Sequence, residues 1–445
     1  MPYVGRTKTI PIELWTEIFD FALGKRDPDA TDGSLSPLEL ASVCDGWKDI
    51  VEHTPALWRD VYMRLSYDKL DTQVADLKRW IKNARSLPLK IYLQTTQDGP
   101  QSASDDMAMD SILDLLLEHS ARIQVLLVVM YRRWYSRFAD PRIRFPILDV
   151  LCIDIEPHPT HDNSVQAPDT QYLDLNEAQF PELSQVQMTN ARQTPSRVSL
   201  SSQRIVNFST LCCNADDCIS RCVDPVFNVQ NYWFVNVPLQ SDYIDHDFEH
   251  DLWYNSATGT PRVLEVDIAE TNPFTMAYML VKLGNCSIRS LSLHAAWEDY
   301  LDVAEIDADT VLMFHDFLLR VVPRFSDALT KLWLEDVFFH EEILLDLLNA
   351  LPGIHNFDLI GPLELTSRFI QALAERDDSV RPPRPKLLPV LQSLNIDATL
   401  SFDDDTRSAF IESRTTLSPV SLDSVFLNYR GSRDAQKEWE WGKED

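Results

Sequence analysis

Glycine is scarce in this chain, which has only 11 glycines among its 445 residues. Enzymes that hold phosphates often do so with glycine-rich loops, because glycine lets the backbone approach the ligand closely. The patterns G-x-x-x-x-G-K-Ser/Thr, G-x-G-x-x-G and G-x-S-x-G are all absent from the sequence. The absence of a P-loop, a dinucleotide-binding loop and a nucleophile elbow favours a protein that is not an enzyme and needs no cofactor.

Cysteines and long apolar runs are also few. The seven cysteines have no regular spacing, which is typical of free thiols in a reducing compartment. The most apolar stretch, residues 123–131, is too short to cross a bilayer. The N-terminus shows no basic region followed by an apolar one, as a secretory signal would. We expect a soluble intracellular protein, located in the cytoplasm, the nucleus or both.

Basic residues are outnumbered by acidic ones. The chain has 40 Lys and Arg against 69 Asp and Glu, so its formal net charge is −29. Nucleic acids and anionic membranes both bind to basic surfaces. We therefore expect neither a nucleic acid nor a membrane as a partner.

Two helical patterns are present near the N-terminus. In the first, Pro11 suits an opening turn, and Leu14, Ile18 and Phe21 share one apolar face. Trp15, Phe19 and Ala22 form a neighbouring apolar face, so this helix needs a partner on each side. The second pattern begins with Ser36, Pro37 and Glu39, which predict a capping box, and its stripe is Leu40, Val43, Cys44 and Trp47.

The order of these residues resembles an F-box of the kind found in fungal, basidiomycete-type F-box proteins. The matching pieces are Ile-Pro-x-Glu-Leu-x-x-x-Ile-Phe, then Val-Cys-x-x-Trp-x-x-Ile, then Thr-Pro-x-Leu-Trp, within residues 8–62. The resemblance implies a three-helix domain that docks on the Skp-type adaptor of a cullin–RING (SCF) ubiquitin ligase. An exposed stripe of Pro11, Leu14, Ile18 and Trp47 should then bury against the adaptor. The adaptor-binding residues that it implies are Ile10, Pro11, Leu14, Ile18, Phe19, Leu40, Val43, Cys44, Trp47, Leu57 and Trp58.

Two departures from the family pattern keep another interpretation open. The loop over residues 24–36 is long, and Asp45-Gly46 falls inside the expected second helix, where glycine costs about 1 kcal/mol relative to alanine. The alternative is a protein-interaction scaffold that recruits no ligase.

The rest of the chain alternates between strand and helix patterns. Its repeated unit is an apolar residue, two spacers, an apolar residue, one spacer and an apolar residue, at 148–153, 183–188, 263–268, 288–293, 329–334, 354–359, 391–396 and 422–427. Helices are predicted at 72–85, 107–119, 273–283, 311–322, 341–351 and 366–375. This alternation resembles an irregular leucine-rich-repeat solenoid, and the simpler alternative is an α/β layer protein with parallel strands.

The expected fold class is therefore α+β or α/β. The expected parts are an F-box domain at 8–62, a linker helix at 63–86, an irregular leucine-rich-repeat-like domain at 87–430 and a charged tail at 431–445. Within the tail, we expect only Trp439 and Trp441 to be ordered.

The alternate residues of the repeated strands should face away from the apolar core. They predict a substrate-binding row, which consists of Glu265, Asp267, Ser290, Ser292, Lys331, Trp333, Asn356, Asp358, Asn395 and Phe426. We expect a protein substrate with a basic or polar surface, anchored by Trp333 and Phe426. The alternative for Trp333 is that it packs under a long loop.

Three other clusters could carry chemistry. Segment 212–222 holds four cysteines without C-x-x-C spacing, and His246 and His250 lack the H-E-x-x-H order. We favour buried thiols and an acidic loop, and expect no metal; a metal-dependent enzyme is the least favoured alternative. Five arginines within 132–144 could grip an acidic partner or a phosphate, but ion pairs with the chain's own carboxylates are favoured.

Overall fold

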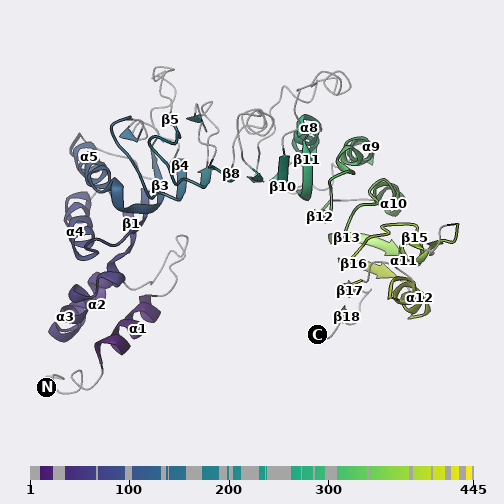
Figure 1. Ribbon diagram of the computed structural model, residues 1–445, viewed down its shortest axis with the longest axis horizontal. Coiled ribbons are helices and arrows are strands. Elements are labelled where there is room, and N and C mark those ends of the chain that lie inside the picture. The colour runs from purple at the N-terminus through teal and green to yellow at the C-terminus, as the bar shows by residue number, and fades with distance from the viewer. Residues whose placement is uncertain are drawn as a thin grey trace. The chain divides into compact units, whose positions relative to one another are not determined.

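The structure is a computed structural model, which describes the following residues: 11–23, 36–66, 69–95, 103–131, 137–138, 140–156, 173–189, 198–199, 204–211, 230–235, 237, 262–271, 273–283, 286–295, 308–337, 340–379, 384–401, 404–415, 422–429 and 437–442. The chain divides into two compact units, Met1–Ile205 and Val206–Asp445. Both are mixed α/β and are built on mostly parallel strands (Figure 1).

The first unit begins with short helices: α1 (Ile12–Leu23), α2 (Pro37–Val43), α3 (Asp45–His53) and the 3-10 helix η2 (Pro55–Trp58). The predicted capping box is confirmed: the Glu39 amide donates to Ser36 Oγ at 3.2 Å, and the Ser36 amide donates to Glu39 Oε2 at 2.6 Å. The single helix predicted after Ser36 is wrong, because Cys44 is extended (φ −164°, ψ 164°) and separates α2 from α3. Gly46 therefore lies in the first turn of α3 and not in a helix interior.

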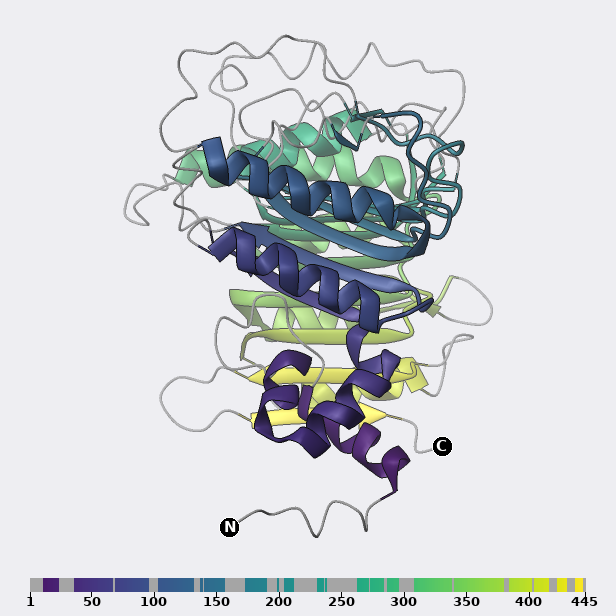
Figure 2. The same ribbon diagram turned by 90° about the vertical axis from the view of Figure 1, so that its left-hand side faces the viewer.

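Parallel strands β1 (Asp60–Leu65), β2 (Leu89–Thr95), β3 (Ile123–Tyr131), β4 (Val150–Glu156) and β6 (Gln185–Thr189) form the sheet of the first unit, in chain order. The helices α4 (Leu70–Asn83) and α5 (Ala103–Glu118) lie side by side along it, as Figure 2 shows. The 3-10 helix η4 (Ser120–Arg122) leads into β3, and β5 (Leu173–Asp174) pairs with β7 (Val198–Ser199) separately. The segment 63–86, expected to be a linker helix, begins within β1, and the helix predicted at 72–85 is present as α4.

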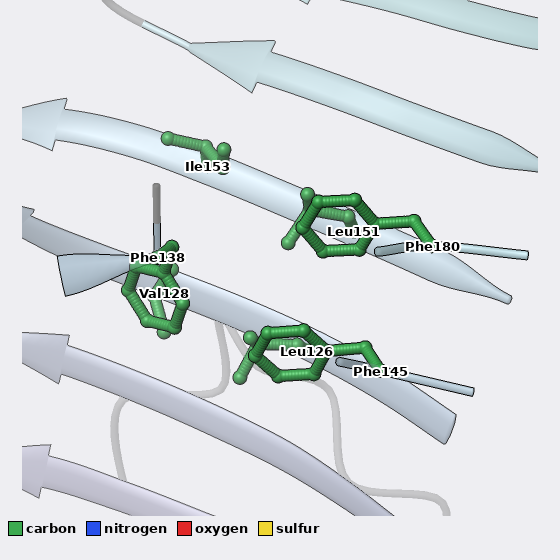
Figure 3. A pocket seen from close by; sticks show the side chains of 7 residues that line it. All are labelled: Leu126, Val128, Phe138, Phe145, Leu151, Ile153 and Phe180. Atoms are coloured by element: carbon green, nitrogen blue, oxygen red, sulfur yellow. The ribbon is translucent and has the colours of Figure 1, made fainter. Parts of the chain in front are cut away.

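Phenylalanines cover β3 and β4 where no described helix does. Phe138, Phe145 and Phe180 lie over Val128, Leu126 and Leu151 respectively, and with Ile153 they line a small apolar pocket (Figure 3). All seven side chains are at most 5% exposed. The rings of Phe145 and Phe180 are stacked 5.4 Å apart. The Gln179 side chain donates to the carbonyl of Phe138 at 2.7 Å, which ties the covering segments together.

The second unit has a longer series of parallel strands. In order they are β8 (Asn207–Leu211), β9 (Asn231–Val235), β10 (Arg262–Thr271), β11 (Ser287–Ala295), β12 (Lys331–Glu335), β13 (Asn356–Thr366), β16 (Ser393–Ser401) and β17 (Ser424–Tyr429). A final strand, β18 (Lys437–Gly442), pairs antiparallel with β17. The expectation that only two tryptophans of the tail are ordered is therefore wrong. A small hairpin, β14 (Arg376–Asp377) with β15 (Arg384–Pro385), lies apart from this sheet.

Helices cover one face of this second sheet. They are α8 (Pro273–Leu283), α9 (Ala308–Val321), α10 (Glu341–Asn349), α11 (Ser367–Ala374) and α12 (Asp404–Thr415), and a 3-10 turn, η8 (Val322–Phe325), follows α9 (Figure 1). The first four match predicted helices to within a few residues. The apolar residues of the repeated unit face the helices: Leu332 and Leu334 on β12, and Leu329 just before it, for example, are at most 1% exposed. No described helix lies on the opposite face, so that face carries the alternate residues.

Candidate functional site: two binding faces

The helix α1 has one buried face and one open face. Trp15 and Phe19 pack on Trp47, with ring centroids 5.6 Å and 4.9 Å apart. On the open side, Leu14 is 48% exposed, Ile18 46% and Phe21 89%. Their i, i+4, i+7 spacing places these three on one stripe, which we name the N-terminal apolar face.

Exposed apolar side chains are concentrated in these first helices. Seven large apolar side chains are exposed in the described part of the chain, and five belong to α1 and α2: Ile12, Leu14, Ile18, Phe21 and Val43. The other two, Met107 and Ile147, lie far along the chain. Scattered exposed apolar residues are ordinary, but a group this dense on so short a segment is typical of an interaction site.

The residues predicted to bind an adaptor fall into two groups. Pro11, Leu14, Ile18, Val43 and Cys44 are exposed. The rest are interior or half-buried, and they hold the helices together: Phe19, Leu40, Leu57 and Trp58 are buried, and Trp47 is half-buried within the aromatic cluster. The prediction that Trp47 belongs to the exposed stripe is therefore wrong, because its ring packs on Trp15 and Phe19. Ile10 lies outside the described residues.

Phe21 was missing from the predicted binding set, although it is the most exposed of these side chains. Its spacing from Leu14 and Ile18 already placed it on their face. The F-box resemblance implies only the residues of the motif, and Phe21 lies beyond the motif.

The predicted substrate-binding residues all lie on the face of the second sheet that no described helix covers. The strand register aligns them, together with Ser393 and Ser424, in two rows across six strands, because directly paired residues share one face. One row is Glu265, Ser290, Lys331, Asn356, Ser393 and Ser424. The other is Asp267, Ser292, Trp333, Asp358, Asn395 and Phe426. We name these two rows the polar sheet face.

Contacts on this face fix the ring of Trp333. Its Nε1–H donates to Glu335 Oε2 at 3.2 Å, and Glu335 also forms an ion pair with His294. The His294 ring meets the Trp333 ring edge-on, with centroids 6.3 Å apart. Lys331 Nζ lies over the same ring, 5.6 Å from its centroid. A tryptophan held in this way is preorganised for a partner.

Carboxylates outnumber cations around Trp333. Burial raises the pKa of the Asp267 carboxyl above its usual 3.8, and the charges of Glu265 and Glu335 raise it further. The positive groups of His294 and Lys331 act in the opposite direction. The ionised form of Asp267 is thus less stable in the folded protein than in water, and a cation arriving from outside would stabilise it.

The other predicted clusters contribute less. The cysteine segment 212–222, His246, His250, Arg132 and Arg133 lie outside the described residues. Arg137 pairs with Asp110 and Asp114 of α5, and Arg142 pairs with Asp140, so these two arginines do bind the chain's own carboxylates. In the described segments, no three His, Cys, Asp or Glu side chains are grouped so as to hold a metal ion.

Three cysteines in the described segments are free thiols. Cys44 is exposed, Cys152 is half-buried and Cys286 is buried. Burial raises the pKa of the Cys152 thiol to about 11 and that of Cys286 to about 12. Both therefore stay protonated at neutral pH, which makes them poor nucleophiles and poor metal ligands.

Comparison with known proteins adds no family assignment. Among the helices of the described segments, none combines the length and the apolar character that crossing a bilayer requires. No protein-family model matches this chain, and no curated protein is similar to it in sequence.

Proposed function

We propose that this protein is a substrate adaptor of an SCF ubiquitin ligase. In this proposal α1, α2, α3 and η2 form an F-box, and the N-terminal apolar face docks on a Skp-type adaptor that is bound to a cullin scaffold. The later strand–helix units act as an irregular leucine-rich-repeat-like solenoid, whose polar sheet face holds the target protein. The ligation chemistry then belongs to a separate conjugating enzyme.

The exposed stripe of α1 is the observation that carries the proposal. Fully burying a Leu, Ile or Phe side chain is worth about 1.5–3 kcal/mol, so three exposed side chains forgo several kcal/mol in the free chain. A helix whose second apolar face stays open while its first is packed suits a partner that covers it. The sequence order of Pro11, Glu13, Leu14, Ile18 and Phe19 matches the F-box pattern at this same place.

The layout of the second unit supports the target-binding part of the proposal. Helices cover one face of its parallel strands, and polar and acidic side chains line the other. Polar rows of this kind cost little in water, yet they offer many hydrogen-bonding groups and carboxylates to a partner. A target with a basic or polar surface fits this face, with Trp333 and Phe426 as its anchors.

Capture of a purified Skp-type adaptor tests the docking step. The test variant is Leu14→Ala, Ile18→Ala and Phe21→Ala combined, in the full-length chain. We expect at least a 30-fold loss of adaptor affinity, since one truncated anchor at an interface centre often costs about 2 kcal/mol. The melting temperature should barely change, because all three side chains are exposed.

Met107→Ala with Ile147→Ala is the matched control, since both side chains are large, apolar and exposed elsewhere. This control should bind the adaptor as well as the wild type. If the wild-type protein captures no Skp-type adaptor, the proposed ligase role is wrong and an interaction scaffold is favoured. Equal loss in both variants would show that the binding does not use α1.

A further inference from the structure

On the polar sheet face, β11 places two small side chains, Ser290 and Ser292, between the larger side chains of β10 and β12. Ser290 lies between Glu265 and Lys331, and Ser292 lies between Asp267 and Trp333. Neighbouring strands are about 4.8 Å apart, so β10 and β12 are separated by about 10 Å. The hydroxyl of Ser290 is buried, and it has no hydrogen-bond partner in the described part of the chain. A polar side chain from outside would meet the carboxylates of β10 and the ring of Trp333 at this place.

Lys331 shows that the ring of Trp333 accepts a cation in this orientation. Its Nζ lies 5.6 Å from the ring centroid, within the range of a cation–π contact. The ring cannot turn away easily, because Glu335 accepts its N–H and His294 packs against it edge-on. The free protein thus keeps one of its own cations over the ring.

We propose that Trp333, Asp267 and Glu265 form a subsite for one lysine or arginine side chain of a protein partner, and that Lys331 holds its place in the free protein. This rests on the proposed function for the role of the polar sheet face in binding a target, and it names the chemistry of that target. The incoming cation displaces Lys331 from the ring and lies between the two carboxylates of β10 and Trp333 of β12. A nucleic acid does not fit, because these carboxylates repel phosphate.

The displacement makes two substitutions act in opposite directions. Lys331→Met keeps most of the side-chain length but removes the competing cation and one like charge. It should tighten the binding of a basic peptide about fivefold, the value of one charge interaction near 4 Å in water. Trp333→Ala removes the ring and should weaken binding about fivefold, as expected for a cation–π contact at a part-exposed site.

The measurement is fluorescence anisotropy with the full-length chain at physiological salt and a labelled hexa-arginine peptide. A hexa-citrulline peptide, which has the same shape without the charge, should not bind. Because the protein is strongly acidic, an off-face control is needed. Asp327→Asn with Asp346→Asn removes two exposed carboxylates from other surfaces, and Glu265→Gln with Asp267→Asn should lose at least three times more affinity than this pair.

Several outcomes would overturn the inference. If the Lys331→Met variant binds the peptide as weakly as the wild type or more weakly, Lys331 does not compete with the partner cation for the ring of Trp333. Equal losses in the on-face and off-face pairs would show that attraction is spread over the whole surface. If Trp333→Ala does not fold, Trp333→Phe should bind about twofold more weakly because its ring is a poorer cation acceptor; unchanged binding would contradict the subsite.

Adaptor capture on the same samples separates the two proposals. A wild type that fails to capture the adaptor but follows the peptide pattern loses only the ligase role. If the wild type captures the adaptor but Lys331→Met and Trp333→Ala do not change peptide binding in opposite directions, only the subsite proposal is wrong.

Discussion

Arg414 is a charged residue placed where charge is costly. Its side chain is only 1% exposed, and it donates to the carbonyls of Leu373, Leu387 and Leu388 at 2.6–3.0 Å. Burial lowers the pKa of its guanidinium to about 9, so it still carries its charge at neutral pH. It joins α12 to the end of α11 and to the segment that leads into β16. The planar fork of arginine suits this, because it reaches several acceptors at once.

Arg414→Met should lower the free energy of unfolding by about 3 kcal/mol or more, since each buried carbonyl left unpaired costs about 1–3 kcal/mol. Chemical denaturation of the full chain measures this loss. Arg384→Met, at an exposed arginine nearby, is the control and should stay within about 0.5 kcal/mol. Equal stability of the two variants would mean that the carbonyls find other donors.

The raised pKa of Asp267 predicts that its contribution to folding stability depends on pH. Because its pKa in the folded state is raised above 3.8, folding disfavours the ionised form. The contribution of this carboxyl to the free energy of unfolding is therefore fully present below the unfolded pKa near 3.8 and is lost as the pH rises through the folded value. Asp267→Asn avoids this loss, so the variant should be more stable than the wild type at pH 7 and should lose that advantage near pH 3.5.

Urea denaturation of both proteins at the two pH values gives the comparison. A wild type that is more stable than the variant at pH 7 would show that ionised Asp267 is stabilised by its neighbours His294 and Lys331. In that case the face would already be neutralised and would have little to gain from a partner cation.

At the scale of elements, the period-2 pattern of the strands was the most informative part of the sequence. It placed Trp333 on one face of its strand and Leu332 and Leu334 on the other, as the structure has them. The helix at 341–351 could also be predicted from its apolar stripe, and the helix at 273–283 from its almost continuous apolar sequence. Local patterns were sufficient here since neighbouring units repeat one packing arrangement.

The elements that could not be predicted have weak local sequence patterns. The segment of α12 has few apolar residues, and its buried face combines Phe410 with the charged Arg414. The strand β18 alternates charged residues with tryptophan, and only its pairing with β17 makes it a strand. The break between α2 and α3 at Cys44 could not be predicted, because no side chain there caps the second helix. The F-box motif ends before Phe21, so the motif alone does not predict that this exposed side chain belongs to the N-terminal apolar face.

The phenylalanines over β3 and β4 give a prediction for a covering segment. Phe180→Ala should cost about 3–5 kcal/mol, as is usual for a buried phenylalanine. The stacked ring of Phe145 would lose its neighbour, and the existing apolar pocket would become larger. Thermal unfolding should show the loss, whereas Phe21→Ala, at an exposed position, should leave the melting temperature nearly unchanged. Similar melting temperatures for the two variants would show that the covering segment is not part of the core.

At the scale of the whole molecule, the net charge of −29 should destabilise the compact state by self-repulsion. Raising the salt concentration from about 0.01 M to 0.15 M shortens the screening length from about 30 Å to about 8 Å. We expect the melting temperature to rise over this range. A decrease would mean that favourable ion pairs, such as Arg79 with Glu52 at 2.7 Å, outweigh the repulsion.

We expect the four cysteines of segment 212–222 to bind no zinc. Purified protein should contain no tightly bound zinc, and Cys218→Ser should leave its melting temperature nearly unchanged. The loss of a true zinc ligand would do far more damage, because binding of a structural metal is coupled to folding. Elemental analysis that finds one equivalent of zinc would contradict this.

The regular register of the polar sheet face also sets a length scale for anything that lies across it. Successive strands repeat every 4.8 Å or so, and two steps span about 9.6 Å. A ligand chain in the polyproline conformation advances about 3.1 Å per residue, so three of its residues span about 9.3 Å. Three residues of such a ligand therefore span nearly the same distance as two strand steps, from β10 to β12 or from β12 to β16. A polyproline ligand that lies across this face would therefore contact it with every third side chain, so its sequence would repeat with a period of three.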